Sequence, residues 1–115
     1  MTDIAVEELA ARLGEVPIVD VRHAGEYNGT AGCSCDPRQG HIPGAVNISL
    51  DELRSLSPEG IRERVGLEPG AEVVAYCHTG ARSGAAVQLL QQAGYNARNY
   101  VGSWHEWART DEPVA

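Results

Sequence analysis

Short apolar runs alternate with amphipathic segments along the chain, and this alternation predicts its strands and helices. Runs rich in Val and Ile are typical of buried strands, whereas apolar residues three and four positions apart are typical of helices that bury one face. Gly and Pro mark the ends of several segments. We expect strands over residues 18–21, 45–48, 73–77 and 97–101, and helices over residues 6–13, 51–56, 58–65, 83–93 and 103–108.

Local signals refine some of these boundaries. Ser49 and Glu52 have the spacing of a capping box, and Ser57-Pro58 has the residues of an N-cap and a first helical position. Glu26-Tyr27 begins a short turn or helix, and residues 28–40 have the Gly, Ser, Asp, Asn and Pro content of a loop. One long loop is therefore expected between the first two strands.

The order of the segments predicts an α/β fold. Strands that alternate with helices usually form a central parallel sheet with helices on both faces. A length of 115 residues fits a single domain over residues 1–115. Ligands of such folds bind beyond the carboxyl ends of the strands, so the functional site is expected at that edge of the sheet.

Composition and charge argue against several classes of function. The 43% hydrophobic content indicates a globular chain, and a net charge of −7 offers no basic patch for a nucleic acid. No apolar run is long enough to span a bilayer and no signal peptide opens the chain, so we expect a cytoplasmic protein with no membrane partner. Three cysteines in a reducing compartment make a disulfide framework unexpected.

The candidate chemistry lies at the end of the third predicted strand, where Cys77 leads through a polar loop into a helix. Free amides at a helix N-terminus stabilise a thiolate or a bound oxyanion. Gly80 allows the loop to curl, and Arg82 adds a permanent cation. A lone Cys at a strand end is usually a small buried apolar residue, but this loop favours a nucleophile. We expect Cys77 to be catalytic and the substrate to contact His78, Thr79, Gly80, Ala81, Arg82 and Ser83.

Four distinctive motifs follow one another along the chain: Val19-Asp20-Val21-Arg22 with Glu26-Tyr27, Gly40-His41-Ile42-Pro43-Gly44-Ala45, Tyr76-Cys77 through Ser83, and Gly102-Ser103-Trp104. Together they resemble the rhodanese family of sulfurtransferases, over nearly the whole chain. The likeness is greatest to the catalytic half of two-domain thiosulfate and mercaptopyruvate sulfurtransferases. The resemblance implies a small rhodanese-like domain that carries a persulfide on Cys77.

Other residues of these motifs are expected to support the site. Asp20 and Arg22 are two apart on a strand and share a face, which favours a structural ion pair over a direct role in the chemistry. His41 and Trp104 come with the resemblance, as structural neighbours of the site. The segment between Tyr27 and Gly40 is longer than in most members of the family, and no role transfers to it.

The resemblance implies a transfer in two steps. The Cys77 thiolate would attack the outer sulfur of a small anionic donor such as thiosulfate, and sulfite would leave. The persulfide would then pass its sulfur to a thiol or a sulfur-carrier protein. Arg82 either binds the anionic end of the donor or braces the loop, and His78 is expected on the substrate side, at the pocket rim. No metal or organic cofactor is expected.

Three alternatives stay open at this point. A phosphatase or arsenate reductase of the related fold has five residues between Cys and Arg, whereas four separate Cys77 from Arg82. The chain can also be a persulfide-carrying domain that serves a larger sulfur-handling protein. Finally, Cys33, Cys35 and His41 could form a metal site, but one residue between the cysteines is poor zinc spacing. A flexible loop with incidental cysteines is favoured, and a redox or sulfur-relay role is the remaining option.

Overall fold

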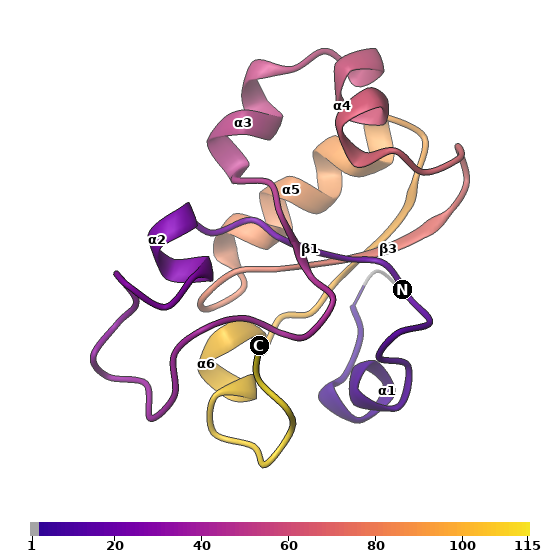
Figure 1. Ribbon diagram of the computed structural model, residues 1–115. Coiled ribbons are helices and arrows are strands. Elements are labelled where there is room, and N and C mark those ends of the chain that lie inside the picture. Colours follow the sequence, from indigo (N-terminus) through magenta and orange to yellow (C-terminus); the bar gives the residue numbers. More distant parts are fainter. Residues whose placement is uncertain (1–2) are drawn as a thin grey trace.

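Four parallel strands run through the middle of the molecule and helices cover both faces of the sheet, as the alternation of segments predicts (Figure 1). The computed structural model describes residues 3–115. The strands lie in the order β2-β1-β3-β4, with β1 at Ile18–Asp20, β2 at Val46–Asn47, β3 at Glu72–Tyr76 and β4 at Asn96–Asn99. The helices are α1 (Val6–Ala11), α2 (Ala24–Tyr27), α3 (Leu50–Ser55), α4 (Pro58–Val65), α5 (Ala81–Gln92) and α6 (Ser103–Trp107).

The two faces of the sheet follow the alternation of side chains along β3. Val73, Ala75 and Cys77 belong to the apolar cluster on the face covered by α3, α4 and α5. Val74 and Tyr76 belong to the cluster on the other face, which α1 and α6 cover. Cys77 follows the last residue of β3 and therefore ends the strand inside the molecule, on the side of α5.

The N-caps at Ser49 and Ser57 are confirmed, although Glu52 does not complete the predicted capping box because its carboxylate pairs with Arg64. The hydroxyl of Ser49 accepts a hydrogen bond from the amide of Glu52 at the start of α3. The hydroxyl of Ser57 accepts one from the amide of Gly60, with proline at the first position of α4. Each cap satisfies one amide that has no partner within its helix, which fixes where these two helices begin.

The most consequential difference from the prediction is the start of α5, which begins at Ala81 rather than at residue 83. Gly80 is the N-cap, with φ at 94°. The loop after Cys77 is therefore shorter than predicted, and Arg82 and Ser83 lie in the first helical turn. Earlier in the chain, α2 ends at Tyr27, whereas the sequence predicts that a helix or turn begins at Glu26.

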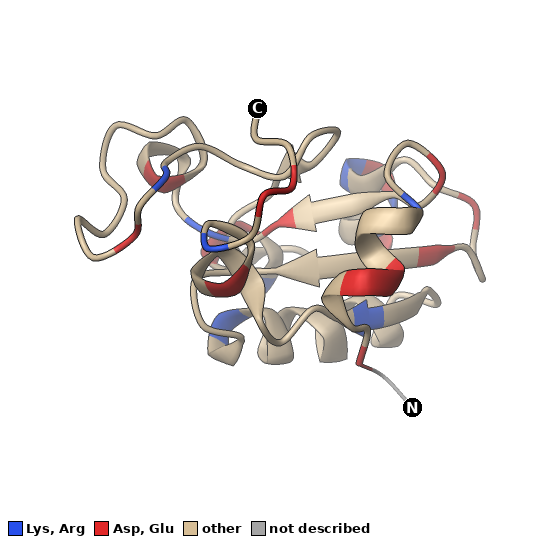
Figure 2. Cartoon of the chain, turned by 90° about the horizontal axis from the view of Figure 1, so that it is seen from below, with Lys and Arg blue, Asp and Glu red and all other residues tan. Residues whose placement is uncertain are grey.

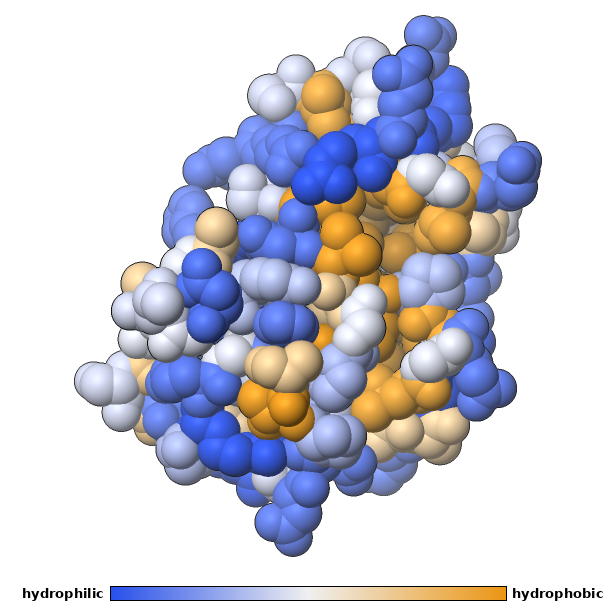
Figure 3. Space-filling view, viewed as in Figure 1, coloured by the Kyte–Doolittle hydropathy of each residue, from blue (hydrophilic) through white to orange (hydrophobic). Residues whose placement is uncertain are grey.

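An apolar groove of about 160 Å³ lies where the C-terminal end of α4 meets the starts of β1 and β2. Figure 3 shows the apolar atoms that gather on this face of the molecule. The groove is lined by Pro17, Ile18, Val19, Gly44, Val46, Ile48, Val65 and Leu67. Because Cys77 follows the opposite, carboxyl end of the sheet, this groove lies apart from the candidate chemistry.

The positions of basic and acidic residues are interspersed along the chain in the view of Figure 2. Several of them form ion pairs. Arg12, which follows α1, lies 2.6 Å from the carboxylate of Glu72 at the start of β3, and Arg98 of β4 lies 3.3 Å from the same carboxylate. Hydrogen bonds from Arg12, and then from Arg98, lower the pKa of Glu72 to about 2. Across residues 3–115, the helices are all too short or too polar to cross a membrane.

Candidate active site

Cys77 lies at the bottom of a tight loop between β3 and α5, and its residue is 1% exposed. The amide of Gly80 donates a hydrogen bond to its Sγ at 3.0 Å. A side chain at residue 80 would be strained at φ 94°, and its Cβ would lie 2.7 Å from the carbonyl oxygen of Val101. Glycine therefore allows the loop to curl its amide onto the sulfur.

The environment of the Cys77 thiol favours its anionic form. Burial alone would raise its pKa, because burial disfavours the charged form. Hydrogen bonds from the side chain of Ser83 and from the amides of Ser83, Gly80 and Thr79 outweigh burial and lower the pKa of Cys77 from its usual value. The loop and the first turn of α5 thus form a ring of donors around one sulfur, as the strand, loop and helix pattern predicts.

A buried polar cluster holds this loop against β4 and α6. Ser83 Oγ lies 3.4 Å from Cys77 Sγ and 2.7 Å from Oδ1 of Asn99, so its single hydroxyl proton can go either to the sulfur or to the amide oxygen, and donation to the sulfur is the form that stabilises the thiolate. The side-chain amide of Asn99 donates to the Gly80 carbonyl at 3.3 Å. The amide of Cys77 donates to Ser103 Oγ at 3.1 Å. Donors and acceptors from three elements therefore set the position of the sulfur.

Ser103 adopts a backbone conformation that L-residues seldom use, with φ at 55°. Its hydroxyl both accepts from Cys77 and donates to the carbonyl of Tyr100 at 2.8 Å. The next amide, of Trp104, donates to the Cys77 carbonyl at 2.9 Å. This backbone conformation therefore allows Ser103 and Trp104 to hydrogen-bond to the amide and the carbonyl of Cys77. Such conformations concentrate at functional sites.

Arg82 forms a two-pronged ion pair with Glu26 of α2, at 2.8 and 3.0 Å. The Arg82 guanidinium holds the pKa of Glu26 below its usual range. The side chain of Arg82 is 33% exposed, so the pair lies at the surface edge of the site. Of the two roles that the sequence leaves open for Arg82, this contact favours bracing the loop against α2.

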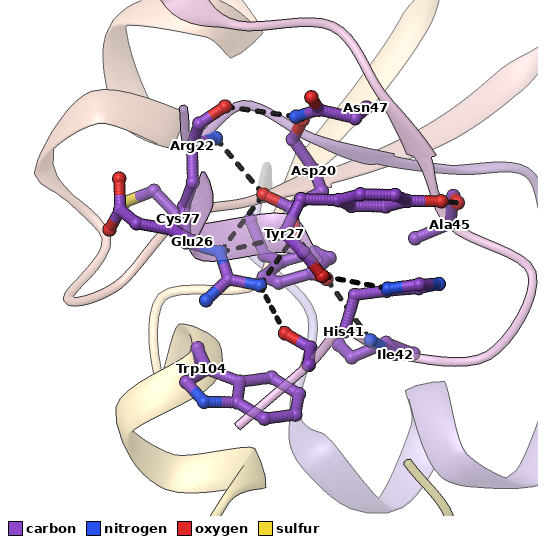
Figure 4. Close-up of polar contacts among 12 residues, drawn as sticks. Asp20, Arg22, Glu26, Tyr27, His41, Ile42, Ala45, Asn47, Cys77 and Trp104 are labelled. Carbon is purple, nitrogen blue, oxygen red and sulfur yellow. Dashed lines mark hydrogen bonds and ion pairs between the residues drawn. The ribbon is translucent and has the colours of Figure 1, made fainter. Parts of the chain in front are cut away.

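Asp20 and Arg22 form the ion pair that their spacing predicts, and both side chains are buried (Figure 4). Arg22 contacts both carboxylate oxygens of Asp20 and donates to the Gly40 carbonyl at 2.7 Å. The Tyr76 hydroxyl donates to Asp20 at 2.6 Å, and burial followed by the charge of Asp20 raises the pKa of Tyr76 well above its usual value. The pair therefore connects β1, β3 and the turn at Gly40 behind the nucleophile.

His41 and Trp104 lie around this buried pair. The Arg22 guanidinium sits 5.1 Å from the ring centroid of Trp104, close enough for a cation–π interaction. Nδ1 of His41 lies 2.9 Å from the Tyr27 carbonyl oxygen, and the His41 ring stacks on the Tyr27 ring at 3.8 Å. Both residues pack the turn at Gly40 and do not contact the sulfur of Cys77 in the structure described.

Comparison with known proteins identifies the family to which this fold belongs. The sequence model of the family described as Rhodanese-like domain matches residues 5–110. The chain belongs to the rhodanese family. The fold class predicted from the sequence, a small rhodanese-like α/β domain with a central parallel sheet, is thereby confirmed.

Individual relatives show how far the likeness extends. A thiosulfate sulfurtransferase of Azotobacter vinelandii is 36% identical over 118 residues, covering 92% of this chain and 43% of the relative. The crystal structure of a probable thiosulfate sulfurtransferase has a TM-score of 0.88 and 42% identity, over 98% of this chain and 47% of that one. A structure of an EanB variant with a cysteine persulfide, in a tetrahedral intermediate state with ergothioneine, has a TM-score of 0.85 and 26% identity. It covers 99% of this chain and 28% of that one, so the chain spans less than half the length of all three relatives.

The long loop of this rhodanese domain is held against the C-terminal segment, so the prediction of a flexible loop is wrong. The guanidinium of Arg38 donates hydrogen bonds of 2.7–3.2 Å to carbonyls of residues 107, 108, 110 and 112. The Trp104 indole donates to the Arg38 carbonyl at 3.1 Å. These partners lie about seventy positions later in the chain, where no local sequence pattern reveals them.

A buried carboxylate joins this loop to the residue after the nucleophile. Asp36 has a fully buried side chain, and its Oδ2 lies 2.8 Å from Nε2 of His78. Arg109 donates to its Oδ1 at 2.8 Å. His78 is therefore turned toward the loop at the edge of the site, as expected for a residue at the pocket rim, and its ring contacts a carboxylate there.

Cys33 and Cys35 form one local disulfide in this loop, with Cα atoms 5.2 Å apart, a bond that the expectation of no disulfide framework did not foresee. The expectation rested on the compartment and the odd number of cysteines, but a tight turn brings these two side chains together. The disfavoured alternative of a metal site at Cys33, Cys35 and His41 also does not match the structure, in which His41 stacks on Tyr27. Instead, ligand atoms of Cys33, Cys35 and His78 lie within 4.8 Å of one another.

The predicted substrate-contact residues fall into three groups. Gly80 and Ser83 are buried against the sulfur, Thr79 and Ala81 are exposed beside it, and His78 and Arg82 are half-buried against the carboxylates of Asp36 and Glu26. The sequence analysis missed the contacts of Asp36, Asn99, Ser103 and Glu26. Glu26 and Ser103 lie in the recognised motifs, which was the only signal available for any of the four.

Proposed function

We propose that this chain is a sulfurtransferase that takes the sulfane sulfur of thiosulfate onto Cys77 and passes it to a thiophilic acceptor. The observation that carries the proposal is the buried Cys77 thiol with the Gly80 amide 3.0 Å from its Sγ. A nucleophilic thiolate and a persulfide are both anions, and the same donors stabilise both. The names of the relatives support the class of reaction.

In the first step, the Cys77 thiolate attacks the outer sulfur of thiosulfate. A bond forms between Sγ and that sulfur, the sulfur–sulfur bond of thiosulfate breaks, and sulfite leaves with the electron pair. The terminal sulfur of the persulfide is then the reactive atom. The amides of Thr79, Gly80 and Ser83 are positioned to stabilise the charge at Sγ throughout this step.

In the second step, an acceptor nucleophile attacks the terminal sulfur and releases the Cys77 thiolate. The acceptor is a thiol or a sulfur-carrier protein in the cell, with cyanide as its substitute in an assay. Such a cycle gives ping-pong kinetics, because the first product leaves before the acceptor reacts. No group outside the chain has to supply an electron or a proton to Sγ for the sulfur to move.

Thiosulfate should be preferred over 3-mercaptopyruvate as donor. Thiosulfate carries two negative charges on a compact group, which suits convergent N–H donors and cations. The Gly80 amide is one such donor, and Arg82, which is permanently charged, lies at the edge of the site in its pair with Glu26. Mercaptopyruvate has one carboxylate, and sulfurtransferases that prefer it tend to have small neutral residues directly after the cysteine. Replacing His78 with Gly should therefore shift the preference toward mercaptopyruvate.

The test is kcat/KM for both donors with cyanide as the common acceptor. We expect the higher value for thiosulfate in the wild-type chain and a smaller ratio in His78→Gly. A higher value for mercaptopyruvate in the wild-type chain would contradict the donor assignment while leaving transfer through Cys77 in place. Absence of thiocyanate with either donor would contradict the sulfurtransferase proposal itself.

A second candidate is favoured by one comparison, because the chain spans 43% of the Azotobacter vinelandii relative and 47% of the solved structure. Residues 1–115 can serve as one persulfide-carrying domain of a larger sulfur-handling protein. Turnover with a small acceptor would then be slow, whereas loading of Cys77 by thiosulfate would be fast. Comparing the rate of sulfite release in one turnover with the steady-state rate distinguishes the two.

A cytoplasmic location stays a prediction.

A further inference from the structure

The Cys33–Cys35 pair lies at the edge of the active site, beside the residue that follows the nucleophile. A ring nitrogen of His78 lies within 4.8 Å of both sulfurs. The carboxylate of Asp36, the next residue after Cys35, lies 2.8 Å from Nε2 of the same ring. His78 directly follows Cys77 in the chain, so the cysteine pair lies beside the side chain of the residue next to the nucleophile.

This position is fixed by contacts that do not involve the sulfurs. Arg109 donates to Asp36 Oδ1 at 2.8 Å and to the Cys35 carbonyl at 2.9 Å. The side-chain amide of Gln39 donates to the Cys33 carbonyl at 2.7 Å. The backbone on which both cysteines stand is therefore anchored independently of the disulfide. Reduction of the bond leaves these anchors in place.

The two sulfurs have different neighbours. The amide of Cys35 donates to Cys33 Sγ at 3.2 Å, which stabilises a negative charge on that sulfur. Sγ of Cys35 lies 3.8 Å from a carboxylate oxygen of Asp36, which disfavours a negative charge there. In the reduced pair, Cys33 is therefore the better nucleophile, and Cys35 is the thiol that acts second.

We propose that the reduced Cys33–Cys35 pair is an internal acceptor for the sulfur on Cys77 and releases it as sulfide. The proposal rests on the sulfurtransferase function proposed above and adds a reaction to it. Thiosulfate would be reduced to sulfite and sulfide by two cysteines of the same chain. The disulfide present in the structure is the oxidised form of this acceptor.

The reaction balances in two steps after Cys77 is loaded. The Cys33 thiolate attacks the terminal sulfur of the Cys77 persulfide, a Cys33–sulfur bond forms, and the Cys77 thiolate leaves. The Cys35 thiolate then attacks Sγ of Cys33, the Cys33–Cys35 bond forms, and hydrogen sulfide leaves with the electron pair. The two cysteines lose two electrons and the transferred sulfur gains them. An external thiol or dithiol reductant regenerates the pair.

Exposure fits these roles. Cys33 and Cys35 are exposed, so an external reductant can reach them, whereas Cys77 is 1% exposed. The terminal sulfur of a persulfide extends roughly 2 Å beyond Sγ, the length of a sulfur–sulfur bond. Loading therefore moves the reacting atom beyond Sγ, and the transfer requires the Cys33 side chain to turn from Cys35 toward that atom once the disulfide is reduced.

The experiment uses the full chain, reduced and then freed of reductant without oxygen, and mixed with excess thiosulfate but no acceptor. Sulfite and sulfide are both counted per chain, and intact mass follows the protein. We expect about one sulfide and two sulfites per chain from the wild type, and an intact mass that loses two hydrogen atoms as the disulfide forms and gains one sulfur as Cys77 is loaded again. The Cys33→Ser and Cys35→Ser double variant should release sulfite but no sulfide. Ser34→Ala, in the same turn, is the matched control and should behave as the wild type.

Single variants test the order of the steps. Cys35→Ser should hold the transferred sulfur on Cys33, and Cys33→Ser should leave it on Cys77, as peptide mass analysis can locate. Sulfite release without sulfide from the reduced wild type would overturn this inference and leave the sulfurtransferase intact. No sulfite would contradict both. Sulfide from Cys77→Ser, or a rate that rises with protein concentration, would also overturn the inference, because transfer would then bypass Cys77 or occur between chains.

Discussion

Two sulfur sites on one chain differ in almost every physical respect. Cys77 is buried in a ring of amides between a strand and a helix, and its pKa is lowered by hydrogen bonds. Cys33 and Cys35 are exposed in a loop and bonded to each other. A buried anion needs donors in fixed positions, whereas thiol exchange with an outside reductant needs access. The fold therefore gives one sulfur site fixed hydrogen-bond donors and gives the other access to solvent.

The scaffolds behind the two sites differ in the same way. Behind Cys77, Arg22 and Asp20 are an ion pair with side chains 1% and 0% exposed. Behind the cysteine pair, Arg109 is 39% exposed, although its partner Asp36 is buried. A charge left alone in the interior is costly, while a charge at the surface keeps its water. Substitution in the Asp20–Arg22 pair should therefore destabilise the protein more than substitution of Arg109.

The largest difference should appear when the nucleophile is removed. Cys77→Ser should reduce thiocyanate formation from thiosulfate and cyanide by about a thousandfold or more, because the hydroxyl is a poor nucleophile at neutral pH. The Cys33→Ser and Cys35→Ser double variant should retain most of this activity, because cyanide takes the sulfur directly from Cys77. Comparable activity in Cys77→Ser and the wild type would refute the assignment of the nucleophile.

The two scaffolds can be compared by matched substitutions of arginine. Arg22→Gln leaves Asp20 buried without its partner and should lower the free energy of unfolding by about 3–5 kcal/mol. Arg109→Gln should cost less, about 1–3 kcal/mol, because the buried Asp36 keeps its contact with Nε2 of His78 at 2.8 Å. Urea unfolding followed by circular dichroism measures both. Equal losses in the two variants would show that the buried pair does not carry the scaffold behind Cys77.

A smaller effect should follow from removing one donor to the nucleophile. Ser83→Ala deletes the side-chain hydrogen bond that helps to lower the pKa of Cys77, so that pKa should rise. The thiolate is the active form, so the acidic limb of the kcat/KM profile should move to higher pH. An unchanged limb, in a variant that still folds, would mean that Ser83 does not act on the sulfur.

The same lowered pKa has a consequence for stability. A thiol that ionises more easily when folded adds stability above its unfolded pKa of about 8.5, and this contribution is lost as pH falls through the folded pKa. The free energy of unfolding should therefore rise with pH across that window in the wild type. In Cys77→Ser this rise should be weaker, as urea midpoints at a series of pH values can show.

The smallest expected effect concerns metal. Cys33, Cys35 and His78 lie close enough to share an ion, but the two cysteine sulfurs are bonded to each other and offer no thiolate. Protein purified without reductant should contain less than about a tenth of an equivalent of zinc or iron by elemental analysis. One equivalent of metal, lost on substitution of both cysteines, would contradict this expectation.

Most of the fold could be predicted from the sequence, because most helices and strands are specified by patterns among neighbouring residues. Apolar alternation along β3 fixes which side chains face α5, and the hydroxyls of Ser49 and Ser57 fix two helix starts. The pattern that places Cys77 between a strand and a helix is also local, so the backbone amides around its sulfur could be predicted. The start of α5 was misplaced because Gly80 at positive φ begins the helix earlier than the apolar spacing indicates.

The missing part of the site depends on contacts between distant positions. Arg82 meets Glu26 across 56 positions, and Arg109 meets Asp36 across 73. Neither carboxylate stands in a pattern that names its partner, so the role of Arg82 stayed open and the loop was expected to be flexible. Only the folded chain brings His78 beside Cys33 and Cys35, which is why their relation to the active site could not be predicted.

The most direct test of the central claim is the intact mass of the protein after brief exposure to thiosulfate without an acceptor. The Cys33→Ser and Cys35→Ser double variant is the best form for this measurement, because sulfur on Cys77 then has no internal acceptor. We predict that its mass rises by one sulfur atom, that peptide analysis places this atom on Cys77, and that cyanide removes it as thiocyanate. No added sulfur, or added sulfur at a position other than Cys77, would contradict transfer through a Cys77 persulfide.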